Sequence, residues 1–290
     1  TTALVTSHGF AGSYSSTSFS LSCSVVAGTG ENMERDYASH SARHFEDLDT
    51  PETIGTRTGE RTLARLNPRK LESMKMPVVY DTRVSASLLG HLSAAISGSA
   101  IARGTSFLRD AMGTQIMSAG LNVIDEPHRP RGLRSAAFDG EGLSPETINL
   151  VQDGVLQSWL LDSTTARQLE LESNARAARG VGGPPSPSAT NLYLAAGTQD
   201  VAGILGDVGE GFFVTELIGM GVNGATGDYS RGASGFRIEN GELTYPVSEV
   251  TIAGNLKDMF GNMTPADDLT FRRGVNAPTV LVEGMTLAGL

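Results

Sequence analysis

Apolar and polar residues alternate along several short stretches of the chain, as they do in strands with one buried face. Between residues 19 and 25 every second residue is apolar and the others are serines: Phe19, Leu21, Cys23 and Val25. Residues 3–28 are therefore predicted to form two strands, connected near Gly9 and Gly12. Residues 29–50 are polar and charged and show no such pattern.

Two stretches show helical features instead. Thr50-Pro51-Glu52 combines a capping side chain, a proline suited to the first helical position and an acid in the first turn. This predicts a helix that runs to about Leu66 and stops at Asn67-Pro68. In residues 82–108 a second group follows helical spacing: Leu88, Leu89, Leu92, Ala95 and Ile96.

Two pairs of residues ending in glycine, Asp153-Gly154 and Asn240-Gly241, lie between apolar runs and predict β-hairpins. The first hairpin should pair Ile148 with Trp159 and Val151 with Leu156. The second should pair Ile238 with Leu243 and Phe236 with Tyr245. Pro246 predicts that the strand there ends or lies at an edge.

The predicted elements are mostly strands with about three helices, and no strand–helix–strand repeat is visible. This favours an α+β fold with mixed and antiparallel sheets over a parallel, doubly wound one. A basic linker at residues 69–75 indicates a domain boundary at about 70–77. The chain starts with Thr1 and its first strand begins almost at once, so an N-terminal portion is expected to be missing from it.

Residues 219–235 are the stretch in which function is first sought. They hold six glycines together with Asn223, Asp228, Ser230 and Arg231, and are predicted to form a loop. The stretch begins with a literal G-x-G-x-x-G after a strand, but loop-like residues follow where a dinucleotide site requires a helix. A dinucleotide site is therefore not expected, and a purely structural glycine loop is the alternative.

The charge of the chain limits its partners. Its 290 residues carry a formal net charge of −10 and no long basic run, which argues against nucleic acid and against acidic membranes. Cys23 is the single cysteine, which fits a reducing, cytoplasmic compartment. No apolar run is long enough for a transmembrane helix.

The histidines give weaker signals. His40 and His44 are four residues apart and on a helix would share a face, as in the start of a metal site. No third ligand is identifiable, and surface or subunit-contact histidines are the alternative. His128 lies among three arginines that could hold an anion or a peptide carboxylate, or simply pair with nearby acids.

Several segments together resemble the TldD/PmbA family, also labelled modulator of DNA gyrase, and specifically its PmbA (TldE) branch. They include SHGFAGSYSSTSFSLS (7–22), SASLLGHLSAAISGSAIARGTSFL (85–108), GGPPSPSATN (182–191) and TGDYSRGASGF (226–236). The resemblance covers essentially the whole chain and corresponds to the C-terminal two-thirds of the family's proteins. It implies that residues 1–74 are the C-terminal part of an N-terminal α/β domain and residues 75–290 a β-rich C-terminal domain.

The resemblance also implies a function in proteolysis or maturation of unfolded or modified peptides. The partner would be a TldD-type paralogous subunit, with a homodimer formed in isolation. That partner is expected to hold zinc with an H-E-x-x-x-H helix and a cysteine. Carried onto this chain, the motif falls on Ala86, Ser87 and His91, so only the last histidine remains, and no cysteine follows Cys23.

The resemblance therefore implies a non-catalytic subunit without zinc or another cofactor. Four residues of the 219–235 stretch become candidate contacts to peptide or partner: Asn223, Asp228, Ser230 and Arg231. Two alternatives stay open. One is an independent hydrolase that uses Asp228, Ser230, Arg231 or His91, and the other is a non-enzymatic homodimer that captures extended peptides by strand addition.

Overall fold

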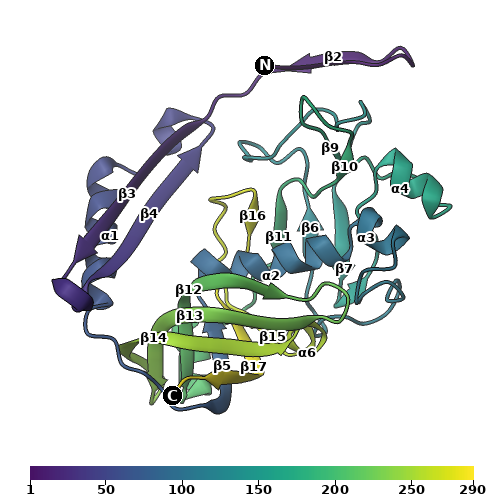
Figure 1. Ribbon diagram of the computed structural model, residues 1–290. Coiled ribbons are helices and arrows are strands. Elements are labelled where there is room, and N and C mark those ends of the chain that lie inside the picture. Colours follow the sequence, from purple (N-terminus) through teal and green to yellow (C-terminus); the bar gives the residue numbers. More distant parts are fainter.

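The N-terminal elements form two separate hairpins and one helix, drawn in purple and blue in the computed structural model (Figure 1). The structure describes residues 1–290, apart from the side chain of Glu31. β1 (Thr2–Val5) pairs with β2 (Ala11–Tyr14), and β3 (Phe19–Ala27) pairs with β4 (Glu34–Ala42). The prediction of two strands over residues 3–28 is thus wrong by one, because the glycine-containing connection is itself the turn of a short hairpin.

Helix α1 (Pro51–Ala64) packs on β3 and β4. Its capping residue is the predicted one: the Thr50 side chain accepts a hydrogen bond from the Thr53 backbone N–H. Its buried face consists of Ile54, Thr58 and Thr62, and the two threonine hydroxyls donate to the helix's own carbonyls. The predicted helix is confirmed and ends two residues early.

A six-stranded sheet dominates the rest of the chain, in the order β14-β13-β12-β5-β17-β15. β14 also pairs with β17, so the sheet curls back on itself. β5 lies between β12, which runs parallel to it, and β17, which runs antiparallel. The strands are β5 (Met74–Tyr80), β12 (Gly211–Val222), β13 (Asp228–Glu239), β14 (Glu242–Asn255), β15 (Met263–Pro265) and β17 (Val280–Ala288).

A smaller five-stranded sheet has the order β16-β11-β6-β7-β8. Its strands are β6 (Val123–Asp125), β7 (Ile148–Gln152), β8 (Val155–Leu156), β11 (Leu192–Leu194) and β16 (Val275–Asn276). A separate two-stranded ribbon pairs β9 (Ala177–Ala178) with β10 (Ser186–Pro187). The remaining short helices are α3 (Gly98–Ala102), α4 (Ser163–Gln168), α5 (Val201–Val208) and α6 (Leu256–Gly261).

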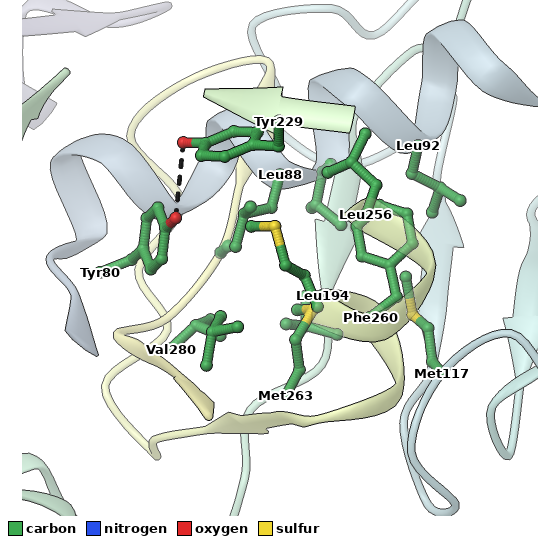
Figure 2. Close-up of a cluster of buried hydrophobic side chains, with 14 of the residues drawn as sticks. Tyr80, Leu88, Leu92, Met117, Leu194, Tyr229, Leu256, Phe260, Met263 and Val280 are labelled. Atoms are coloured by element: carbon green, nitrogen blue, oxygen red, sulfur yellow. Dashed lines mark hydrogen bonds between the residues drawn. The ribbon is translucent and has the colours of Figure 1, made fainter. Parts of the chain in front are cut away.

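Helix α2 (Thr82–Ala95) lies between the two sheets (Figure 1). Its leucines, Leu88, Leu89 and Leu92, are buried in one hydrophobic cluster with side chains from both sheets. Figure 2 shows this cluster, which Phe260 of α6 also enters. Each fully buried leucine contributes about 1.5–3 kcal/mol, so α2 is held firmly where the two sheets meet. The mixed sheets with few helices confirm the α+β class.

Both predicted hairpins exist, but the first is shorter than expected and the second has a shifted register. Val151 pairs with Leu156 as predicted, but β8 ends there, and Ile148 pairs with Asp125 of β6 rather than with Trp159. In the second hairpin Ile238 pairs with Leu243 as predicted.

A register shift between Phe236 and Ile238 places Phe236 opposite Pro246 instead of Tyr245. β14 continues through Pro246, whose carbonyl accepts a hydrogen bond from the backbone N–H of Arg69 in the linker.

The glycine-rich stretch 219–235 is not a loop, which corrects the prediction. β12 and β13 run through it as a long hairpin, and only residues 223–227 form a turn. Glycine is required where backbones approach closely: a Cβ on Gly221 would lie 2.1 Å from the Ser230 carbonyl oxygen. The glycines therefore permit tight strand packing rather than a flexible loop.

No helix in the described part of the chain is long and apolar enough to cross a membrane.

Candidate functional site

His91 lies on α2, whose N-cap is Asp81. The His91 ring meets the ring of Tyr229 edge-on, with 5.8 Å between the ring centroids. Burial lowers the pKa of His91, and the nearby positive charge of Arg231 lowers it further. The imidazole is therefore held neutral next to a cation.

The His91 Nε2 atom is buried and has no hydrogen-bond partner among the described residues. A buried nitrogen without a partner carries a desolvation cost of about 1–3 kcal/mol. An imidazole nitrogen is also a possible zinc ligand, so the groups around His91 decide whether this locus could hold the metal.

Tyr80 and Tyr229 face each other beside His91. Their hydroxyl oxygens are 3.4 Å apart, and the Tyr80 hydroxyl also lies 3.4 Å from the Met285 sulfur. Figure 2 shows the pair at one end of the hydrophobic cluster. Burial raises the pKa of both tyrosines. Both hydroxyls therefore stay protonated, and neither supplies an anion that could bind a metal.

The His91 locus does not fit zinc. Zinc in proteins takes histidine, thiolate and carboxylate ligands, whereas the neighbours here are a neutral phenol, Tyr229, and a cation, Arg231. The single cysteine, Cys23, lies on β3 in the N-terminal part. Within the described residues no three histidine, cysteine, aspartate or glutamate side chains are grouped as metal ligands.

The turn between β12 and β13 is organised by Asn223 and Asp228. The Asn223 side chain accepts from the backbone N–H of Ala225, and its backbone N–H donates to the Asp228 carbonyl over 2.8 Å. The Asp228 carboxylate accepts from the Thr226 hydroxyl and from Asn255. These two hydrogen bonds lower its pKa, with the one from Thr226 the larger cause. Both candidate residues thus hold their own turn while staying exposed.

Ser230 and Arg231 point to opposite faces of β13, because side chains alternate along a strand. Arg231 shares the face of Tyr229, and its Nε–H donates to the Ile218 carbonyl over 3.3 Å. Ser230 and Asp228 are exposed on the other face. The structure therefore brings Arg231 to His91 and separates Ser230 and Asp228 from it.

The other histidines lie in ionic surroundings. His40 is on β4, not on a helix, so it does not share a helical face with His44, which corrects that expectation. The His40 Nδ1 accepts the backbone N–H of Asp49 over 3.0 Å. His44 lies 3.6 Å from Glu46 at the surface.

Two arginines near His128 pair with acids, which was the alternative left open for that group. Arg129 contacts Glu126 and Arg131 contacts Asp47, at 2.8 and 2.7 Å.

The tyrosine pair was missed by the sequence analysis. Tyr80 and Tyr229 are 149 residues apart, and no spacing or motif connects them. The one available signal was an aromatic residue with polar neighbours inside the glycine-rich stretch.

Comparison with known proteins assigns the chain to a family. Residues 73–289 match the PmbA/TldA metallopeptidase C-terminal domain, and residues 1–66 match the PmbA/TldA metallopeptidase central domain. The chain belongs to the PmbA/TldD family. The resemblance inferred from the sequence segments is thereby confirmed.

Within the PmbA/TldD family, the Metalloprotease PmbA of Escherichia coli O157:H7 is 45% identical over 98% of this chain and 61% of its own length. A Metalloprotease PmbA homolog of Haemophilus influenzae is 38% identical, with the same coverage of both chains. The chain therefore spans about three fifths of the length of these relatives.

Solved structures of the PmbA/TldD type agree with this fold. A Bacteroides thetaiotaomicron protein, named as a candidate modulator of DNA gyrase, superimposes with a TM-score of 0.89 at 32% identity, over 98% of this chain and 63% of its own. TldE from Thermococcus kodakarensis gives a TM-score of 0.83 at 22% identity, over 94% of this chain and 63% of its own, which shows the shared fold alone.

Proposed function

We propose that this chain is the PmbA/TldE-type, non-catalytic subunit of a two-subunit metallopeptidase that degrades or matures unfolded or modified peptides in the cytoplasm. A TldD-type paralogue supplies the zinc and the catalytic groups. This chain supplies a wall of the peptide channel and the contact to that partner.

The observation that carries this proposal is the composition of the His91 locus. The relatives are named metalloproteases, yet a phenol, Tyr229, and a guanidinium, Arg231, surround the one histidine left of the zinc motif. A chain of a peptidase family that keeps the fold and replaces the metal ligands fits the role of a supporting subunit. Arg231 also repels a metal cation.

The exposed end of the β12–β13 hairpin is the proposed contact surface. Ile218 and Met220 on β12 are 58% and 87% exposed, which is unusual for large apolar side chains. Asn223 and Asp228 fix the turn next to them. Arg231 of β13 holds β12 in the same region through its hydrogen bond to the Ile218 carbonyl.

Strand addition is a second candidate function, favoured by one feature of β12. Its pairing with β5 covers only Phe212–Val214, whereas its pairing with β13 continues to Val222. Residues 215–222 thus leave one strand edge without a partner strand in the described chain. An extended peptide could hydrogen-bond to this edge.

An independent hydrolase has less support. A nucleophile and its base must lie within hydrogen-bond reach, and Ser230 and Asp228 lie on the face of β13 opposite Tyr229 and His91. The Asp228 carboxylate is already occupied by Thr226 and Asn255.

Co-elution with the TldD-type paralogue, together with peptide cleavage, tests the proposal. The pair should co-elute and cleave an unfolded peptide faster than the paralogue alone, while this chain alone binds no stoichiometric zinc and cleaves nothing. Met220→Asp should weaken co-elution, whereas Val181→Asp, at another fully exposed apolar position, should not.

The proposal is lost if the two chains elute separately and cleavage by the paralogue is unchanged. Retention of unfolded peptides by this chain alone, without turnover and sensitive to Met220→Asp, would support the strand-addition function instead.

A further inference from the structure

A cavity of about 360 Å³ lies between the N-terminal elements and the loop before β16. It is unusual in its charge, because five arginines line it and no acidic residue does: Arg57, Arg61, Arg83, Arg272 and Arg273. We refer to it as the arginine cavity. The whole chain carries a formal net charge of −10, so this is a local concentration of positive charge in an acidic protein.

Neighbouring carboxylates form ion pairs with only three of the five arginines. Asp49 binds both Arg57 and Arg272, at 2.8 Å each. Asp36 and Asp81 both lie against Arg83, at 3.0 and 3.4 Å.

Arg61 and Arg273 form no ion pair with the described side chains. The Arg61 Nη1–H reaches the Tyr37 carbonyl at 3.4 Å, and the Arg273 Nη1–H donates to the Arg83 carbonyl at 2.9 Å. Burial lowers the pKa of Arg61, and the charge of Arg83 lowers it further. Asp81 and Asp36 act on Arg61 from a greater distance and raise its pKa. Two guanidinium groups thus line one cavity without an ion-paired carboxylate among the described side chains.

The cavity walls are fixed rather than loose. Asn276 is 5% exposed, and its side-chain oxygen accepts from the backbone N–H groups of both Arg272 and Arg273, at 2.9 Å each. Arg83 lies in the first turn of α2, and its Nη1 donates to both Asp36 carboxylate oxygens, at 3.0 and 3.2 Å. Arg61 stands on α1. Three separately anchored elements therefore present donors to one space.

A second cavity of about 370 Å³ shares Arg272 and Arg273 with the first. Its lining adds Arg43, Arg129 and Arg131. Eight of the 22 basic residues of the chain are thus gathered along one seam between the N-terminal part and the rest of the molecule.

We propose that the arginine cavity is a binding site for a small oxyanion, a carboxylate or a phosphate, held by Arg61 and Arg273. Guanidinium groups present paired N–H donors that match the two oxygens of either group. The cavity volume is at the lower end of the range for small-ligand sites. This inference goes beyond the proposed function and does not depend on the partner subunit.

Calorimetric titration of the full chain tests the site in two arms. One arm uses inorganic phosphate. The other uses a short peptide with a free C-terminal carboxylate, and the same peptide with a C-terminal amide is its blank. The R61Q/R273Q double variant removes two charges without breaking an ion pair, so it should fold. Binding should weaken at least tenfold, because charge-assisted hydrogen bonds are among the strong ones.

The matched control is R103Q/R167Q, which removes two exposed arginines outside the cavity and should bind like the wild type. The R61K/R273K variant keeps the charge and loses the paired donors, so its affinity should be intermediate. The arm that responds identifies the source of the oxyanion. The proposal is overturned if neither anion binds, or if R61Q/R273Q and the control bind equally well.

Discussion

His91 and its neighbours form a locus in which each side chain limits what the others can do. The His91 side chain projects from α2 toward the Tyr229 ring, and the charge of Arg231 lies nearby. Beside it the Tyr80 hydroxyl donates to the Tyr229 hydroxyl oxygen over 3.4 Å, and both tyrosines are buried.

Replacing Tyr229 by phenylalanine should cost about 1 kcal/mol of unfolding free energy. The Tyr80 hydroxyl, 0% exposed, would keep only the Met285 sulfur, a weak acceptor. Urea unfolding measures the change. Tyr37→Phe is the control, because Tyr37 is 46% exposed, and equal behaviour of the two variants would contradict this account.

His40 should make the protein sensitive to acid. Burial and, next, the positive charge of Arg272 lower the pKa of His40 below its unfolded value of about 6.5. A lowered histidine pKa means that the unfolded chain binds more protons, so this stability is present above about pH 6.5 and is lost as pH falls through the folded pKa. Protonation also removes the acceptor of the Asp49 N–H.

The measurement is the unfolding free energy as a function of pH. His40→Gln should flatten its fall below about pH 6.5. His91 contributes with the same sign, because its pKa is lowered too, so some slope should remain. The exposed His8→Gln should leave the wild-type curve unchanged, and a His40→Gln curve as steep as that of the wild type would refute the assignment.

The sequence identified His91 as a candidate residue, but only through the resemblance to the family. Its neighbours could not be predicted, since Tyr229 lies on a strand 138 positions further along the chain. The side of β13 on which Arg231 points depends on the strand register, which no local pattern encodes.

Glycine has opposite effects on stability in a helix and in a tightly packed strand of this fold. Gly59 lies within α1, and nothing is within 4 Å of where its Cβ would be. Gly235 on β13 would place a Cβ 1.9 Å from the Phe213 carbonyl oxygen. Alanine should therefore be tolerated at the first position and not at the second.

Gly59→Ala should stabilise the protein by about 0.5–1 kcal/mol, because helical glycine costs backbone entropy. Gly235→Ala should destabilise it by about 1–3 kcal/mol through forced strand separation. Thermal unfolding measures the stability change of both variants, and each variant serves as the control for the other. Changes of the same sign would show that the backbone at Gly235 can relax.

Local sequence signals predicted the elements that begin or end at a characteristic capping or turn residue. Thr50 before Pro51 located α1, and Asn240-Gly241 located its hairpin. The same logic failed at residues 219–235, because glycine density indicated a loop where close strand packing required small residues. Helix α5 was missed, although Asp200 caps its first turn and Gly209, with positive φ, ends it.

Across the whole molecule, ion pairs join the N-terminal part to the rest. Arg65 at the end of α1 contacts Glu216 of β12 at 2.6 Å. Asp36 of β4 is 3% exposed and binds Arg83 of α2. These contacts cross between segments that are far apart in sequence, so they set how the two parts sit against each other.

Asp36→Asn should cost about 3 kcal/mol, because it leaves Arg83 without its closest carboxylate in a nearly dry place. It should also speed proteolysis of the linker at residues 67–73. Asp110→Asn, at an exposed surface pair with Arg109, should change neither quantity. Unchanged proteolysis in Asp36→Asn would mean that other contacts hold the two parts together.

The position of β5 has a consequence for how the chain is made. β5 is one of the first strands of the large sheet to leave the ribosome, yet both of its neighbours come much later: Tyr80 pairs with Val214 and with Val280. During synthesis, one edge of the apolar run Val78–Tyr80 must therefore wait 134 further residues for its partner (214 − 80) and the other edge 200 (280 − 80). Bare apolar edges associate with other chains, so protection of this strand during translation should determine the yield of folded protein.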